Sequence, residues 1–194
     1  TRVLKVSYAG EKGFEIHVHN GSMKKIYDEL VQHGENFNLI HFGMLALDSM
    51  RLEKNYRSWK SDLTSDYTML QSGLEKWIKF DKGNFIGKEA LKNEFDLGTS
   101  KKFVTLVVDD PEDNKPFGEP VYLSPVFAGD DYLGPIVSSG YGHRVKKSIS
   151  MAILDDRNLN GLNDQLYIDV LGRKRKAYIV NEALYDPENL KLRS

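Results

Sequence analysis

The chain has 194 residues, of which 40% are hydrophobic, and it carries 27 lysines and arginines against 28 aspartates and glutamates. This length can bury one generous core or two small ones, and the near-balanced charge argues against a nucleic-acid partner. Because cysteine is absent, a disulfide framework and a thiolate metal site are both excluded. No apolar run approaches the ~20 residues that span a bilayer, so we expect a soluble chain without a membrane partner.

The chain opens with two runs of alternating apolar and polar side chains. Residues 4–8 and 14–18 have the period of two that is typical of half-buried strands, and the glycines between them supply a turn. Successive side chains of a strand point to opposite faces, so Glu15 points away from Phe14 and Ile16. The pattern leaves open whether its carboxylate faces solvent or a pocket.

Histidines give little support for a metal site. His17 and His19 share a strand face at a spacing that a metal could use, but we interpret them as ordinary polar residues. His143 is interpreted as a surface loop residue, although its side chain titrates near neutral pH. We therefore predict no metal.

Helical spacing follows the two strands. Apolar residues recur every three or four positions after a Ser22 cap, and Gly34 stands where a helix is expected to stop. A second helix is predicted over about residues 42–56, with a polar side and an apolar stripe. A shorter helix is expected to begin near Lys88, after a turn that contains glycine.

The pattern changes after the polar stretch of residues 96–102, where we place a domain boundary. Two domains are expected, a partial one over residues 1–97 and a second over residues 98–194. Short runs with glycine, proline and aspartate turns predict about six strands in the second domain. These are residues 103–108, 120–124, 136–139, 148–154, 165–171 and 176–180. Such strands favour a small closed barrel over a sandwich, because closure removes exposed edges.

Three motifs carry a resemblance that runs nearly end to end. They are Ser7-Tyr-Ala-Gly-Glu-Lys-Gly-Phe-Glu15, the segment over residues 42–59 that contains Asp-Ser-Met-Arg-Leu-Glu-Lys-Asn-Tyr-Arg-Ser-Trp, and Asp81-Lys-Gly-Asn-Phe-Ile-Gly-Lys88. They resemble the C-terminal part of the glycine-cleavage T-protein (aminomethyltransferase) family, and most closely the folate-binding tail of dimethylglycine and sarcosine dehydrogenases. The resemblance implies an α+β fold, with a T-protein-like folate-binding α/β subdomain followed by a small antiparallel β-barrel.

In such dehydrogenases a flavin domain oxidises an N-methyl amine, and the T-protein-like tail passes the one-carbon unit to tetrahydrofolate. The resemblance thus implies tetrahydrofolate as cofactor, with flavin adenine dinucleotide only in an N-terminal part that is missing here. This chain has no glycine-rich dinucleotide fingerprint. We expect it to belong to a longer enzyme, to be inactive alone, and to come from bacterial cytoplasm or the mitochondrial matrix.

The resemblance implies three folate-binding residues, namely Tyr8, Glu15 and Tyr185. A pterin presents an amine and a ring N–H side by side, which the carboxylate of Glu15 can meet with two parallel hydrogen bonds. Tyr8 can offer its ring and its hydroxyl, although an ordinary core aromatic is the alternative. Tyr185, near the end of the chain, is expected to close over the folate.

Three departures from the family pattern limit which functional residues can be assigned from the resemblance. Leu47 stands where T-proteins often have an arginine, and Gln71 stands where they have a glutamate. The family's catalytic aspartate has no match in this chain, so we predict no catalytic residue here. Arg51 and Glu53 are family markers to which we assign packing roles.

Large aromatic residues add little about function. Trp59 and Trp77 are interpreted as core or domain-interface residues.

Other functions remain open at this point. A plain aminomethyltransferase, or a folate-dependent demethylase of a sulfonium compound, would fit the same motifs. A non-catalytic folate-binding or docking module is the alternative of another class. The iron–sulfur assembly proteins of this fold carry a characteristic cysteine, which is absent here.

Overall fold

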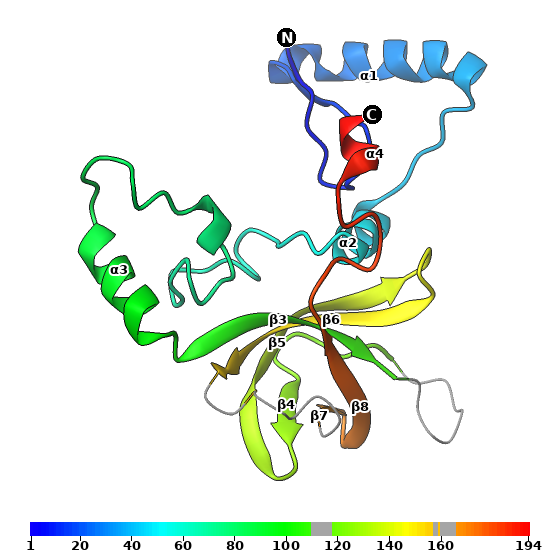
Figure 1. Ribbon diagram of the computed structural model, residues 1–194. Coiled ribbons are helices and arrows are strands. Elements are labelled where there is room, and N and C mark those ends of the chain that lie inside the picture. The colour runs from blue at the N-terminus through cyan, green and yellow to red at the C-terminus, as the bar shows by residue number, and fades with distance from the viewer. Residues whose placement is uncertain (110–117, 157–158, 160–165) are drawn as a thin grey trace.

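A computed structural model describes residues 1–109, 118–156, 159 and 166–194 of the chain. Its C-terminal half forms a closed barrel, and its N-terminal half forms helices, a small hairpin and long connecting loops (Figure 1). None of the described helices is long and apolar enough to cross a membrane.

The chain begins with a two-stranded antiparallel sheet of β1 (Arg2–Leu4) and β2 (Glu15–His17). Leu4 lies opposite Glu15 in this ladder. Only Leu4 of the predicted run over residues 4–8 belongs to β1, because the chain leaves the ladder after Leu4 and loops back, whereas β2 lies within the predicted run over residues 14–18. Every residue of the two strands is exposed, so alternation here does not mark a buried face.

Helix α1 (Asn20–Gly34) follows directly and confirms the predicted helix. Its N-terminal cap is His19, whose ring Nδ1 accepts a hydrogen bond from the backbone of Gly21 at 3.3 Å, and not Ser22 as expected. The α-helix ends at Gly34 as predicted, and the chain continues into a 3₁₀ turn, η1 (Glu35–Phe37). A side chain at Gly34 would collide with Leu39, so glycine permits the loop to pack back onto the helix.

Helix α2 (Met44–Glu53) is shorter than predicted at both ends. A loop, a 3₁₀ turn η2 (Glu75–Trp77) and helix α3 (Lys88–Leu97) lead to the barrel, and α3 begins at the residue predicted. Trp59 and Trp77 are both mainly exposed, so the expectation that they fill a core is wrong within this chain.

Six antiparallel strands close the barrel in the order β3-β6-β5-β4-β7-β8. They are β3 (Lys101–Val108), β4 (Pro125–Ala128), β5 (Asp131–Gly142), β6 (Lys147–Asp155), β7 (Leu166–Val170) and β8 (Arg173–Val180). The predicted α+β fold with a small antiparallel barrel is therefore confirmed. Closure satisfies the backbone groups that an open sheet would leave at its edges.

One predicted strand is wrong. The stretch 120–124 forms a turn in which Leu123 has a φ of 69°, and the nearest strand is β4, a few residues later. The hydroxyl of Ser124 accepts a hydrogen bond from the backbone of Val121 at 3.1 Å, which stabilises this turn. The apolar residues of this turn have the sequence pattern of a strand. The pattern does not show that one of them adopts a left-handed conformation.

Helix α2 is the element that joins the two halves. Leu52 packs into the same buried cluster as Ile149 and Met151 of the barrel. The hydroxyl of Ser49 donates a hydrogen bond to the backbone oxygen of Tyr141 at 2.6 Å. Figure 1 shows α2 between the barrel and the N-terminal hairpin, with the chain end and its short helix α4 (Leu190–Arg193) returning beside that hairpin.

Candidate functional site

Glu15, the first predicted folate residue, lies at the start of β2 with its side chain 53% exposed. Its Oε2 atom is 3.3 Å from Nε2 of His17 on the same face of the strand. Within the described part of the chain, the carboxylate makes no other hydrogen bond. The exposed carboxylate is free to receive two N–H donors from a ligand.

Tyr8, the second predicted residue, is half-buried, and its hydroxyl donates to the backbone oxygen of Arg57 at 3.0 Å. Burial raises the pKa of Tyr8 above its usual value, although the nearby positive charge of Arg51 opposes that rise. The phenol therefore stays protonated and ties the opening loop to the segment after α2. Because its hydroxyl is bonded to a backbone oxygen of the protein, the ring is the part of Tyr8 that a ligand can contact.

Tyr185, the third predicted residue, bridges two segments that are far apart in the sequence. Its hydroxyl donates to Oε1 of Glu11 at 2.7 Å and accepts from the guanidinium of Arg144 at 2.9 Å. The Arg144 guanidinium also lies 4.4 Å from the centre of the Tyr185 ring, in cation–π contact. The hydrogen bond to Glu11 raises the pKa of Tyr185, so the phenol keeps its proton. These side chains line a hollow of about 340 Å³ together with Ala9.

A buried lysine fixes the tail that carries Tyr185. Nζ of Lys54 donates to Oδ2 of Asp186 at 2.6 Å and to the backbone oxygen of the same residue at 3.0 Å. The backbone N–H of Tyr185 donates to the backbone oxygen of Glu53, the neighbour of Lys54 on α2. Gly10 lies against the same lysine, since a Cβ there would be 2.5 Å from its Cγ. The opening loop, α2 and the tail thus meet at Lys54.

Arg51 and Asp62 form a second buried connection. Nη1 of Arg51 is 3.0 Å from Oδ2 of Asp62, and Nη2 donates to the Ser138 hydroxyl at 2.9 Å. Asp62 is completely buried and also accepts from the Ser138 hydroxyl and from the backbone N–H of Ser58. The buried pair joins α2, the loop after it and β5, an arrangement that supports the packing role assigned to Arg51.

Glu53 also binds the protein backbone. Its Oε1 accepts from the N–H groups of Arg144 at 2.7 Å and Val145 at 3.0 Å, which holds the turn between β5 and β6. The carboxylate is buried, so its role is to position the turn that carries Arg144. Arg144 in turn reaches Tyr185.

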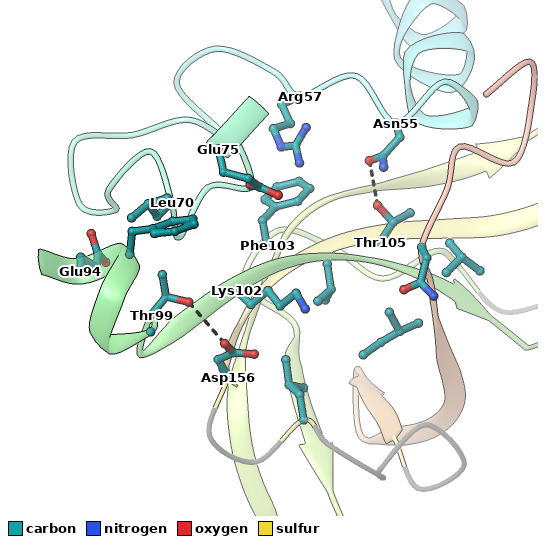
Figure 2. Close-up of a pocket in the computed structure, with 18 residues that line it drawn as sticks. Asn55, Arg57, Leu70, Glu75, Glu94, Thr99, Lys102, Phe103, Thr105 and Asp156 are labelled. Atoms are coloured by element: carbon teal, nitrogen blue, oxygen red, sulfur yellow. Dashed lines mark hydrogen bonds between the residues drawn. The ribbon is translucent and has the colours of Figure 1, made fainter. Parts of the chain in front are cut away.

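A larger cavity, of about 770 Å³, lies between the loop before α3 and the barrel (Figure 2). The Thr105 hydroxyl donates to Asn55 at 2.8 Å on one side, and the Thr99 hydroxyl donates to Asp156 at 3.3 Å on the other. Its lining mixes basic, acidic and aromatic side chains. None of the three predicted folate residues lines this cavity.

Arg57 and Lys102 are two basic residues that line that cavity (Figure 2). The guanidinium carbon of Arg57 lies 4.2 Å from the centre of the Phe103 ring, and its Nε is buried without a hydrogen-bond partner among the described residues. Burial lowers the pKa of Arg57, while the charges of Glu75 and Asp62 oppose this effect. The cavity therefore contains a positive charge that lies against the Phe103 ring, with the carboxylate of Glu75 in the same lining.

The three predicted folate-binding residues thus lie in the opening loop, on the hairpin and in the tail. Tyr8 and Tyr185 are linked through the loop that contains Glu11, whereas Glu15 lies on the exposed hairpin. Sequence reasoning missed the partners Glu11 and Lys54, whose contacts join segments far apart in the chain. Single charged residues give no pattern in a sequence, although Glu11 lies in the first family motif and Lys54 in the second.

The barrel, the bridging helix α2 and the exposed hairpin together define an α+β protein of the aminomethyltransferase type. Two family models of that type match the chain: the GCVT N-terminal domain over residues 1–82 and the glycine cleavage T-protein C-terminal barrel domain over residues 101–186. The chain belongs to the glycine-cleavage T-protein family, which binds tetrahydrofolate.

Two curated proteins illustrate what the chain is similar to. The chain is 30% identical over 183 residues to the aminomethyltransferase of Thermoanaerobacter sp. (strain X514), covering 94% of this chain and 48% of that protein. It is also 30% identical over 186 residues to the mitochondrial dimethylglycine dehydrogenase of Mus musculus, covering 93% of this chain and 20% of that protein. The chain therefore spans about half, or a fifth, of the length of these relatives.

A solved structure supports the fold. The glycine cleavage system aminomethyltransferase T from Bartonella henselae matches with a TM-score of 0.80 at 20% sequence identity. The match covers 95% of this chain and 50% of that chain. At this identity the similarity establishes the fold alone.

Proposed function

We propose that this chain contributes part of the tetrahydrofolate pocket of a flavin-linked N-methyl amine demethylase of the dimethylglycine or sarcosine dehydrogenase kind. The single observation that carries the proposal is the exposed carboxylate of Glu15, held on a strand within the segment that the N-terminal family model matches. The proposal treats residues 1–97 as a partial folate-binding domain and residues 98–194 as the barrel domain. The flavin would belong to another part of the whole protein.

The chemistry of the pterin explains the choice of Glu15. Its two adjacent N–H groups can donate parallel hydrogen bonds to the two oxygens of one carboxylate, an arrangement that is both strong and orienting. Weak pairing with His17 at 3.3 Å is easily exchanged for such a ligand. Tyr8 would support the ligand through its ring, because its hydroxyl is already bonded to the backbone of Arg57.

Tyr185 would lie at the other end of the ligand. The tail that carries it is attached to α2 by Lys54 and to the opening loop by Glu11. A folate lying along that loop would pass from Glu15 toward the hollow beside Tyr185. The tail would then exclude water from the reacting end, as a closing segment does in many enzymes.

The reaction would be transfer of a one-carbon unit. Oxidation of an N-methyl amine gives an iminium carbon, which the two folate nitrogens attack to form the 5,10-methylene product. The demethylated amine leaves with one of the two displaced protons, and the other is released. We assign no catalytic residue of this chain to that step, and its residues would bind and orient the folate.

A glycine-cleavage aminomethyltransferase is the second candidate, because relatives of that kind match at the same 30% identity as the dehydrogenase. Leu47 favours the dehydrogenase, since an arginine is frequent at that place in T-proteins. Both candidates require tetrahydrofolate, so folate binding tests their shared part. Assaying the whole protein with dimethylglycine, sarcosine and aminomethylated H-protein would separate them.

The test of folate binding is calorimetric titration of tetrahydrofolate, in anaerobic buffer, into the chain and into Glu15→Gln. Saturable binding that weakens at least ~10-fold in the variant is expected, because one charge-assisted pair is worth about 1.5–3 kcal/mol. Glu29→Gln is the matched control, since Glu29 forms a similar exposed pair with His33, at 3.6 Å. Equal affinity in Glu15→Gln and the unchanged chain would refute the role of Glu15.

If the chain alone does not bind, the same titration is made on the protein that contains the rest of the aminomethyltransferase fold. Binding there, with loss in Glu15→Gln, would support the proposal. Failure there as well would show that the family fold has been kept without its ligand.

A further inference from the structure

The half-buried guanidinium of Arg57 makes no hydrogen bond and no ion pair within the described part of the chain. Its Nε atom is buried, whereas its two Nη groups are accessible in the large cavity between the segment before α3 and the barrel. The buried arginines Arg51 and Arg175 differ, because each donates hydrogen bonds to acceptors of the protein. Since buried polar groups are normally hydrogen-bonded, unused donors that face a cavity indicate a ligand.

Two neighbours hold the Arg57 side chain in place. Its guanidinium carbon lies 4.2 Å from the centre of the Phe103 ring, which is itself buried in the barrel cluster. Gly73 has a φ of 64°, and a Cβ there would be 2.7 Å from Nη2 of the arginine. The glycine thus leaves the room that the guanidinium occupies. An arginine fixed in this way presents its N–H groups to a ligand at little cost in side-chain entropy.

A carboxylate is the group that matches the two Nη groups. A guanidinium presents parallel N–H donors that meet the two oxygens of one carboxylate. These donors point from the edge of the guanidinium, so a carboxylate can bind there while the Phe103 ring keeps its contact. The carboxylate of Glu75 lies close enough for its charge to affect the pKa of Arg57, yet its oxygens are more than 4.0 Å from the guanidinium nitrogens.

Glu75 can receive a cationic group of the same ligand. Its side chain is exposed, lines the cavity, and makes no hydrogen bond or ion pair with the described residues. The two other carboxylates of the lining accept from hydroxyl groups of the protein, Asp156 from Thr99 at 3.3 Å and Glu94 from Thr68 at 3.0 Å. A guanidinium and a carboxylate that share a cavity without pairing with each other suit a ligand that carries both charges.

Part of the cavity lining is apolar. Leu70, Phe95, Val104 and Ile179 contribute to it. The volume of about 770 Å³ is within the range of about 300–1,000 Å³ of small-molecule sites, which combine apolar walls with a few polar groups. A ligand with an apolar side chain can therefore lie against these walls.

We propose that this cavity binds a free α-amino acid with an apolar side chain. The carboxylate of the ligand pairs with the Nη groups of Arg57, and its ammonium group pairs with Glu75. Its side chain lies against the wall that contains Leu70 and Ile179. The inference does not depend on the proposed function, because none of the three predicted folate residues lines this cavity. Arg57 and Glu75 come from the segment after α2 and Phe103 from β3, so the site is built by this chain (Figure 2).

The test uses L-leucine and two analogues that each lack one charge. They are 4-methylpentanoate, which has no ammonium group, and 3-methylbutylamine, which has no carboxylate. Each is titrated into the chain at pH 7, and the NMR signal of the Arg57 Nε–H group is followed. We expect a saturable shift with L-leucine and at least ~10-fold weaker binding of each analogue, because each loses one charge-assisted pair. A dissociation constant for L-leucine above about 10 mM would overturn the proposal.

Three variants assign the contacts, and calorimetry measures their affinities. Arg57→Met should weaken L-leucine and 4-methylpentanoate at least ~10-fold, whereas Glu75→Gln should weaken only L-leucine to that extent. Lys102→Met removes an exposed cation from the same lining and should change both affinities by less than ~3-fold. Equal losses in Arg57→Met and Lys102→Met would mean that general charge attraction replaces specific pairing, which would overturn the proposal.

The calorimetric titration of L-leucine is repeated on the whole protein that contains this chain. Binding there that Arg57→Met weakens to the same extent would support the proposal. Binding to the chain that is lost in the whole protein would show that another part of the protein fills the cavity, and would overturn it. Tetrahydrofolate titration is read separately, since loss of folate binding in Glu15→Gln should leave the affinity for L-leucine unchanged.

Discussion

Lys54 and Asp186 are 132 residues apart in the sequence, and Nζ of the lysine lies 2.6 Å from Oδ2 of the aspartate. The Lys54 side chain is fully buried, and its ammonium lies 5.9 and 5.6 Å from the ring centres of Tyr56 and Tyr185. The contact attaches the end of the chain to the helix that joins its two halves. It thereby fixes the residue proposed to close over folate.

This ion pair should make stability depend on pH in acid. The hydrogen bond from Lys54 lowers the pKa of Asp186 below its ordinary value of 3.8. Its folded pKa is therefore below its unfolded pKa, so its contribution is fully present above about pH 4 and is lost as the pH falls through the folded pKa. Thermal unfolding of the chain and of Asp186→Asn is measured from pH 7 to pH 2. The variant should have the lower Tm at pH 7, and the difference in Tm between the two proteins should disappear below pH 4. A difference that stays constant to pH 2 would contradict the assignment.

Asp62 should be the most sensitive carboxylate of the segment between α2 and α3. In Asp62→Ala, Arg51 would keep its contact with the partly exposed Asp48 at 2.8 Å but would lose its buried partner, and such a loss costs about 3–5 kcal/mol in the free energy of unfolding. Asp66→Ala, at an exposed carboxylate nearby, is the control and should change stability by less than about 0.5 kcal/mol. Urea unfolding at pH 7 measures both. A change below about 1 kcal/mol in Asp62→Ala would show that Asp48, Ser138 and the backbone oxygen of Tyr56 together satisfy the arginine.

Gly10→Ala should lower the free energy of unfolding, because Gly10 lies where the opening loop and the tail meet at Lys54. Gly10 has a φ of 77°, which costs other residues about 1–3 kcal/mol. An added methyl group would also meet the buried stem of Lys54. Gly87→Ala is a matched control, because Gly87 has a φ of 86° with nothing within 4 Å of an added Cβ. Gly10→Ala should be the more destabilising of the two; equal losses would mean that contact with Lys54 contributes nothing.

Of two residues that line the large cavity, Arg57 should contribute little to the free energy of unfolding and Phe103 should contribute much. Arg57→Met removes a cation–π contact worth about 0.5–2 kcal/mol, but it also removes a buried unpaired Nε that costs about 1–3 kcal/mol. We expect a net change within about 1 kcal/mol. Phe103→Ala should cost about 3–5 kcal/mol, because the ring is buried in the barrel cluster. A loss above about 2 kcal/mol in Arg57→Met would indicate a further partner of the guanidinium.

The pattern of the sequence predicted the barrel well. Short runs between turn residues identified five of the six barrel strands, and only β4 was misplaced. The position of β4 depends on the left-handed turn at Leu123, which no alternation encodes. The motifs around Glu15 and α2 identified the family, because several residue types recur there in a fixed order.

What the sequence determined, then, was local: which segments form helices and strands, and which motifs belong to the T-protein family. The tertiary structure alone decided that Lys54 meets Asp186, that Tyr185 meets Glu11, and that the apolar stripe of α1 lies open. The physical reason is that helices and strands follow from neighbouring side chains and their spacing. Contacts between distant residues follow from barrel closure and from how the tail packs on α2, and neither leaves a periodic signal in the chain.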